Sequence, residues 1–126
     1  MERKLDRLFK VLSDNTRLRL LSLLAQRPHC VCEFQSILRA SQPTVSRHLA
    51  YLRRSGLVEV ERHGKMIMYL LAKPDDPIQA ILLRCVYACI SEGGYYQQDV
   101  KRSQETEPLI QQQGITRKPL TAAKPR

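Results

Sequence analysis

Four cysteines are the residues of this chain with the clearest capacity for chemistry, and they form two pairs. Cys30 and Cys32 are separated by one residue and follow a break at Pro28, whereas Cys85 and Cys89 are four residues apart. Thiolates are soft ligands that favour thiophilic metal and metalloid ions. A thiol at the start of a helix also ionises more readily than a free one. The first pair therefore predicts a regulatory thiol site for a soft ion.

The spacing of the first pair sets a mechanical condition on that site. Side chains two residues apart point about 200° apart on a regular helix. Cys30 and Cys32 would then bind one ion only if the first turn of their helix were bent or unwound. Such a distortion would pass along residues 33–39 towards the helix that follows. The alternative is inert packing, because free cysteines often fill small buried gaps.

The second pair of cysteines is open to two interpretations. Cys85 and Cys89 are predicted on one face of a helix, since residues four apart are neighbours there. The same stripe contains Ile78 and Leu82, which favours packing in a dimer core. The alternative is that one of the two cysteines completes a three-sulfur site or pairs with a thiol of the first pair. His29 is a further ligand, a base for a neighbouring thiol, or simply an exposed loop residue.

A second group of polar side chains lies on the predicted helix over residues 43–54. At 100° per residue, Val45, Leu49 and Leu52 fall on one side and leave hydrogen-bond donors on the other. Such donors match base edges and phosphates in DNA. His48 borders the apolar side, where packing is the alternative role. The predicted DNA-contacting residues of this segment are Gln42, Thr44, Ser46, Arg47, His48 and Tyr51.

Helical periodicity predicts the elements that position both groups. Apolar residues at helical spacing indicate helices around residues 5–12 and 18–24. A short third helix over residues 32–39 leads through a tight turn into the helix over residues 43–54, with Ser41 suited to capping it. Two short helices joined in this way are typical of a helix-turn-helix.

A β-hairpin with a basic tip is predicted next. Residues 57–63 alternate apolar and polar side chains, Gly64 supplies a turn, and residues 66–72 return as a second strand. The tip should add salt-sensitive affinity for phosphate. Its basic residues are Arg62, His63 and Lys65. The chain is therefore predicted to be a winged helix-turn-helix, mainly α with a small β-hairpin, in the order α-α-α-α-β-β-α.

The last predicted helix is apolar enough to need a cover. It begins at residues 74–77 and ends near Ser91. The expected cover is the same helix of a second subunit, together with the first helix, which makes a homodimer. Residues 1–92 are thus the predicted DNA-binding and dimerisation domain. Residues 93–126 contain few apolar side chains and are predicted to be a flexible, disordered tail.

Composition favours a DNA-binding protein of the cytoplasm. Lys and Arg outnumber Asp and Glu by 21 to 12, and the net charge of +9 suggests a polyanionic partner. No apolar run approaches the roughly 20 residues of a membrane-spanning helix, and the N-terminus does not resemble a signal peptide. The thiols are then expected to be reduced. An enzyme is not expected, and a thiol oxidoreductase is the distant alternative, because CxxC and nucleotide-loop motifs are absent.

These motifs together resemble the ArsR/SmtB family of metal- and metalloid-responsive winged-helix repressors. The resemblance covers roughly residues 5–92. It rests on LSDNTRLRLLSLL at residues 12–24, CVC at 30–32, SQPTVSRHLAYLRRSGLV at 41–58 and HGKMIMYLL at 63–71.

The resemblance implies a ligand and a mechanism. It implies a homodimer that binds palindromic operator DNA and leaves it when As(III) or Sb(III) binds Cys30 and Cys32. A common family pattern, ELCVCDLC, reads PHCVCEFQ here, so Gln35 stands where a third cysteine would be, and Cys85 or Cys89 is the possible third ligand. The histidines of the family's zinc sites are missing from the last helix. The alternative inducers are a soft divalent metal, methylated arsenic or persulfide, and no cofactor is expected.

Overall fold

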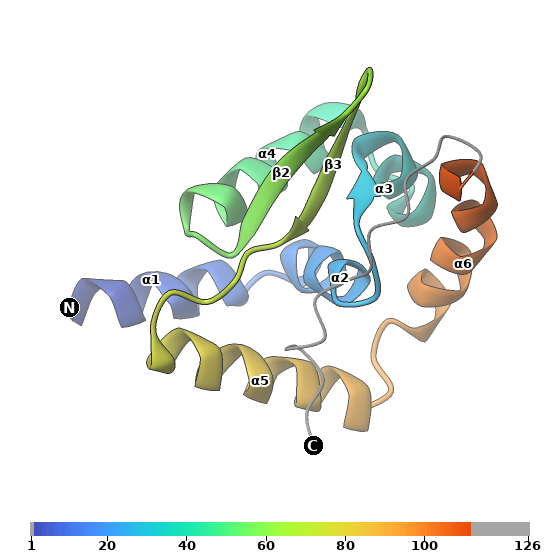
Figure 1. Ribbon diagram of the computed structural model, residues 1–126. Helices are drawn as coiled ribbons and strands as arrows, with labels where there is room; N and C mark the ends of the chain where they lie inside the picture. Colours follow the sequence, from blue (N-terminus) through green and yellow to red (C-terminus); the bar gives the residue numbers. More distant parts are fainter. Residues whose placement is uncertain (1, 112–126) are drawn as a thin grey trace.

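A β-hairpin projects from a helical body, as Figure 1 shows. The computed structural model describes residues 2–111 of the chain. In this part of the chain, no helix is both long and apolar enough to cross a membrane. The elements are α1 (Glu2–Leu12), α2 (Asn15–Leu24), β1 (His29–Cys30), α3 (Val31–Leu38), α4 (Gln42–Arg54), β2 (Val58–His63), β3 (Met66–Leu71), α5 (Pro77–Glu92) and α6 (Gln97–Gln111).

Side-chain caps fix where three of the helices begin. The Asp14 carboxylate accepts a hydrogen bond from the backbone N–H of Arg17 at 3.0 Å, and the Asp76 carboxylate caps α5 in the same way. The Ser41 hydroxyl caps α4, which has proline in its first turn. Each cap satisfies a backbone donor that the helix itself cannot pair. The cap predicted at Ser41 is confirmed.

The core of the helix-turn-helix is built from α2, α3 and α4. Phe34 of α3 is fully buried, and so are Leu49 and Leu52 on the predicted inner face of α4. The turn between α3 and α4 contains Arg39 in the left-handed conformation, with φ of 54°. This turn fixes the direction of α4 relative to α3, so a movement of α3 is passed to α4.

The predicted hairpin is part of a three-stranded antiparallel sheet. The strand order is β1-β3-β2, with Tyr69 of β3 between His29 of β1 and Val60 of β2. Strand β1 was not predicted, because a strand of two residues is too short to show an alternating pattern. It attaches the residues just before α3 to the base of the wing.

Helix α5 leaves its predicted apolar stripe largely open. Ile78 and Ile81 are 59% and 58% exposed. Cys85 and Cys89 are free thiols on the same helix and are also exposed. Within one described chain, the stripe is therefore available to a second subunit.

Residues 97–111 form α6, in the segment from residue 93 that the sequence predicts to be a disordered tail. Helix α6 turns back from the end of α5 and packs against α2 and α3 (Figure 1). Its buried residues are polar: Asp99 and Ser103 are 4% and 2% exposed. The prediction was wrong here because it relied on apolar content, and this helix is held by polar partners. The rest of the predicted tail, residues 112–126, lies outside the described residues.

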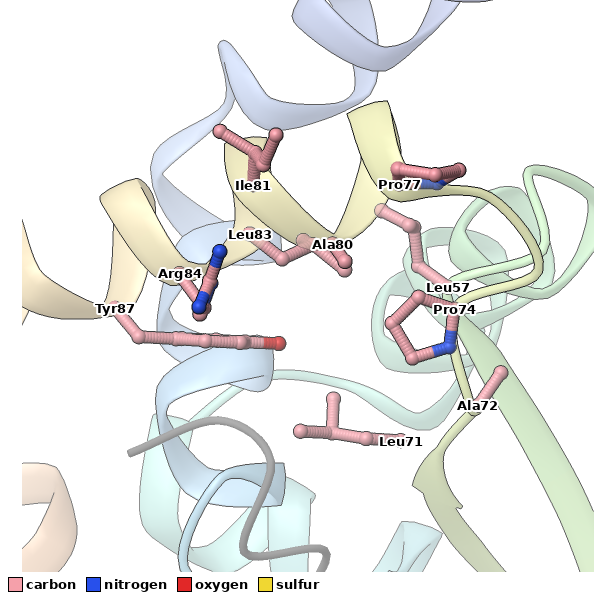
Figure 2. Close-up of a pocket in the computed structure, with 10 residues that line it drawn as sticks. All are labelled: Leu57, Leu71, Ala72, Pro74, Pro77, Ala80, Ile81, Leu83, Arg84 and Tyr87. Carbon is pink, nitrogen blue, oxygen red and sulfur yellow. The ribbon is translucent and has the colours of Figure 1, made fainter. Parts of the chain in front are cut away.

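A cavity of about 420 Å³ separates the first half of α5 from the base of the wing. Figure 2 shows its lining, which is mostly apolar, and the Tyr87 side chain with its hydroxyl directed into the space. That hydroxyl is buried and has no hydrogen-bond partner among the described residues. Burial raises the pKa of Tyr87.

Candidate functional site

Cys30 and Cys32 bring their sulfur atoms together at the start of α3. The two Sγ atoms lie 2.7 Å apart, and both thiols are free. Cys30 is the N-cap residue and has an extended backbone, with φ of −91° and ψ of 166°. The prediction that the first turn must bend or unwind is therefore wrong, because Cys30 belongs to β1 and not to the helix.

The distance between the sulfurs suits a shared ion after a small adjustment. In a tetrahedral thiolate centre with bonds of about 2.3 Å, as zinc has, two sulfurs lie about 3.8 Å apart. Cys30 and Cys32 would have to separate by about 1 Å, which a modest rotation of one side chain supplies. The pair is thus assembled before any ion binds.

The two thiols differ in their surroundings. Cys32 is exposed, whereas Cys30 is only 4% exposed. Burial, followed by the hydrogen bond to Cys32, raises the pKa of the Cys30 thiol to about 12. The expectation that the helix start favours a thiolate is therefore wrong for Cys30, where desolvation outweighs the helix. Solvent reaches Cys32 first.

A third sulfur is not supplied by the described part of this chain. Cys85 and Cys89 lie on α5, which Figure 1 shows on the other side of the molecule from α3. Gln35 occupies the family's third position on α3 and is half-buried. Among the described residues, no group of three His, Cys, Asp or Glu side chains is placed to hold a metal ion.

A buried ion pair stands directly behind the thiols. One Glu33 carboxylate oxygen, Oε1, accepts the backbone N–H of Cys30 at 3.1 Å. The other, Oε2, accepts Nη2 of Arg27 at 2.6 Å. Arg27 and the backbone of Cys30 lower the pKa of Glu33 against the effect of its burial. The carboxylate therefore fixes the turn on which Cys30 sits.

His29 is neither exposed nor free to bind an ion. It is fully buried, with Nδ1 2.9 Å from the Arg27 carbonyl and Nε2 2.6 Å from the Ser103 hydroxyl. Burial, and next the charge of Arg27, lowers its pKa to about 4. The ring is therefore neutral, and because a carbonyl only accepts, Nδ1 donates to Arg27 while the Ser103 hydroxyl donates to Nε2.

Sequence reasoning missed the polar residues behind the thiols. They are Arg27, Glu33, Ser103 and Thr106. A signal for Glu33 was present, since an acidic residue three positions after an N-cap is typical of a capping box. The positions on α6 carry no comparable signal, because their partners are more than 60 residues away in the sequence.

The predicted DNA-contacting residues of α4 occupy one accessible side of the helix. Gln42, Arg47 and Tyr51 are exposed, and Thr44 and Ser46 are half-buried. The side-chain amide of Gln42 donates to the Ser46 hydroxyl at 2.8 Å. These residues form a continuous donor-rich surface at the start of α4.

His48 lies against α2 instead of facing outward. Its Nδ1 atom is 3.4 Å from Nη1 of Arg17 and 3.8 Å from a carboxylate oxygen of Asp14. The Arg17 guanidinium also covers the Tyr51 ring, 4.4 Å from its centroid. These contacts favour the packing role for His48.

The tip of the wing carries the predicted basic side chains. Arg62 and Lys65 are exposed, and Nε of Arg62 donates to the carbonyl of Gly64 at 3.1 Å. His63 is half-buried, with Nε2 2.9 Å from a carboxylate oxygen of Glu61. The tip thus presents two cations to solvent at the far end of the hairpin.

Comparisons with known proteins agree on one family. A family model described as "Bacterial regulatory protein, arsR family" matches residues 14–60. The arsenical resistance operon repressor of Escherichia coli K12 is 47% identical over 66 residues, which are 52% of this chain and 56% of that repressor. The match therefore spans little more than half of that relative's length. An uncharacterized HTH-type transcriptional regulator of Methanocaldococcus jannaschii is 36% identical over 63% of this chain and 88% of its own length.

A solved structure extends the agreement to the fold. The homodimeric winged helix-turn-helix DNA-binding domain of a possible ArsR-family regulator from Mycobacterium bovis is similar, with a TM-score of 0.58 and 30% identity. The similarity covers 69% of this chain and 81% of that domain. The predicted winged helix-turn-helix fold is confirmed, with β1 and α6 as additions.

Proposed function

The chain belongs to the arsR family of bacterial regulatory proteins, and on this premise we propose that it is a metalloid-responsive transcriptional repressor. It binds operator DNA as a homodimer and leaves it when As(III) or Sb(III) binds Cys30 and Cys32. The observation that carries the proposal is the pair of Sγ atoms 2.7 Å apart at the start of α3. A relative named an arsenical resistance operon repressor supports the choice of metalloid.

On this proposal, α4 enters the major groove and the wing contacts the DNA backbone. Base contacts come from the first turns of α4 and positioning contacts from phosphate. His48 is assigned to packing because of its contacts with α2. The residues proposed to contact DNA are Gln42, Thr44, Ser46, Arg47, Tyr51, Arg62, His63 and Lys65.

The binding reaction is a condensation that leaves the protein's net charge unchanged. Each thiol that attacks arsenous acid forms one S–As bond, and its proton leaves with one arsenic hydroxyl as water. Two thiols therefore release two waters. Cys32 reacts first because it is exposed, and Cys30 follows. Since the Cys30 proton leaves in the water, its raised pKa does not prevent the second bond.

Separation of the sulfurs supplies the mechanical step. When Cys30 and Cys32 move apart by about 1 Å to share one ion, the start of α3 is displaced. Helix α3 is short and is joined to α4 by the fixed turn at Arg39. The displacement therefore reorients α4 relative to the operator.

Titration of a protein–DNA complex tests the proposal. Fluorescence anisotropy on a promoter fragment should show that arsenite weakens operator binding by about 5- to 150-fold, the usual range for coupled sites. Cys30→Ser and Cys32→Ser should remove the effect of arsenite, whereas Cys85→Ser and Cys89→Ser serve as matched controls. Release of DNA from the double Cys30→Ser/Cys32→Ser variant by arsenite would rule the proposal out.

The same thiol pair also suits a second inducer. Two sulfurs in contact can be joined by additional sulfur atoms without a large movement of the backbone, which favours a persulfide signal as the second candidate. A soft divalent metal and methylated arsenic are two further candidate inducers for a pair of thiols. Mass spectrometry of the liganded protein distinguishes them, because each inducer adds a different mass.

A further inference from the structure

Helix α6 contacts α3 at both ends of that helix. At the start of α3, Thr106 donates to Oε2 of Glu33 at 2.9 Å. At the other end, Nη1 of Arg102 donates to the carbonyl of Ile37 at 3.0 Å. Carbonyls in the last turn of a helix lack intrahelical partners and attract cations. Helix α6 therefore braces the whole length of α3.

The contacts at the start of α3 converge on the backbone of Cys30. Arg27 donates through Nη2 to the carbonyl of Ser103 at 2.8 Å and to Glu33 at 2.6 Å. Ser103 donates to His29, the residue before Cys30, and Glu33 caps the N–H of Cys30. Each of these groups is buried, so the network has no water to replace a lost partner.

The brace is anchored on α2 by a separate pair of contacts. Asp99 accepts two hydrogen bonds from Arg19, at 2.7 and 2.8 Å, in a bidentate ion pair. The Tyr96 hydroxyl donates to the side-chain oxygen of Asn15 at 2.9 Å. Helix α6 is thereby fixed to the body at one end and to the thiol turn at the other.

We propose that α6 is a positioning element for the thiol pair, in which Ser103 and Thr106 hold the Cys30 turn so that both sulfurs meet one ion. This inference rests on the proposed function of the pair as an ion site. Groups that orient a ligand from behind typically change metal affinity by about 10- to 100-fold when they are removed. By linkage, an ion that displaces Cys30 also loosens the hold of α6 on α3.

The test uses the full-length reduced protein and two variants on α6. Ser103→Ala removes the donor to His29, and Gln104→Ala alters an exposed neighbour on the same helix as the matched control. Two quantities are measured for each protein: the affinity for arsenite by calorimetry, and the rate of alkylation of Cys30 by iodoacetamide, located by peptide mass spectrometry. Both are measured at a temperature at which circular dichroism shows every protein folded.

The expected result separates positioning from stability. Ser103→Ala should weaken arsenite binding about 10-fold and should speed alkylation of Cys30, whereas Gln104→Ala changes neither. Equal affinities and equal alkylation rates in the folded variant and the parent would overturn the inference. If the parent itself fails to bind arsenite, the proposed function is lost, and alkylation alone still decides the role of α6.

Thr106→Val provides a second, independent variant. It removes the hydroxyl that donates to Glu33 and nearly preserves the shape of the side chain. If Ser103→Ala does not fold, the same two measurements on Thr106→Val decide the question. Faster alkylation of Cys30 supports the inference, and an unchanged rate overturns it.

Discussion

At the scale of single residues, burial decides the protonation of the groups around the thiol pair. Cys30 is kept as a neutral thiol and His29 as a neutral imidazole, because neither charged form is well solvated. The charges that are buried, Arg27 and Glu33, lie 2.6 Å apart and compensate each other. The site is therefore electrically quiet until an external ion reaches Cys32.

The buried imidazole of His29 predicts a loss of stability in mild acid. Its pKa is about 4 in the fold and 6.5 in the unfolded chain, so its contribution is complete above pH 6.5 and is lost as the pH falls towards 4. Between pH 7 and pH 5, the loss should be about 2 kcal/mol. Urea unfolding of the parent and of His29→Gln at both pH values measures it. An equal loss in the two proteins would contradict the assignment.

The Tyr87 hydroxyl predicts a substitution that costs no stability. It points into the cavity beside α5 without a partner among the described residues (Figure 2). Removing a buried polar group that lacks a hydrogen bond is neutral or favourable. Tyr87→Phe should therefore leave the free energy of unfolding unchanged or raise it by up to about 1 kcal/mol. A decrease of more than about 1 kcal/mol in urea unfolding would show that the hydroxyl is paired in solution.

At the scale of elements, local signals predicted those parts of the fold that depend on local chemistry. The N-cap at Ser41 and the apolar face of Leu49 and Leu52 determine α4, and they were readable in the sequence. The thiol pair was readable too, but its geometry depends on β1, whose two residues gain their conformation from pairing with β3. Helix α6 escaped because its stability comes from distant ionic partners such as Arg19.

The ion pair between Arg19 and Asp99 predicts that α6 can be released without unfolding the body. Asp99 is buried, and removal of one partner leaves an uncompensated charge that costs about 3 kcal/mol or more. Asp99→Asn should therefore increase amide hydrogen exchange over residues 97–106 while α4 stays protected. Glu105→Gln, an exposed change on the same helix, is the control. Loss of protection in α4 as well would show that α6 is part of the cooperative core.

At the scale of the whole molecule, two functional surfaces lie on different sides. The donor-rich side of α4 and the basic wing tip form one surface, and the open apolar stripe of α5 forms the other. The thiol turn lies between α6 and the wing base, because β1 pairs with β3 while α6 packs on α3. An ion at this turn is thus placed to change the relation between the DNA-binding helix and the rest of the body.

The open stripe of α5 predicts a dimer whose disruption abolishes tight operator binding. Ile78 is 59% exposed on α5, and a charge there should split the proposed interface, because an unpaired buried charge is strongly unfavourable. Ile78→Glu should give a monomer in sedimentation equilibrium. Since each monomer contacts one half-site about one helical turn from the next, operator affinity should fall with the dimer. Ile67→Glu is the matched control, because Ile67 is 41% exposed on β3, away from the stripe. A dimer that persists in Ile78→Glu would place the interface elsewhere, and a monomer that still binds full operator with parental affinity would separate DNA binding from dimerisation.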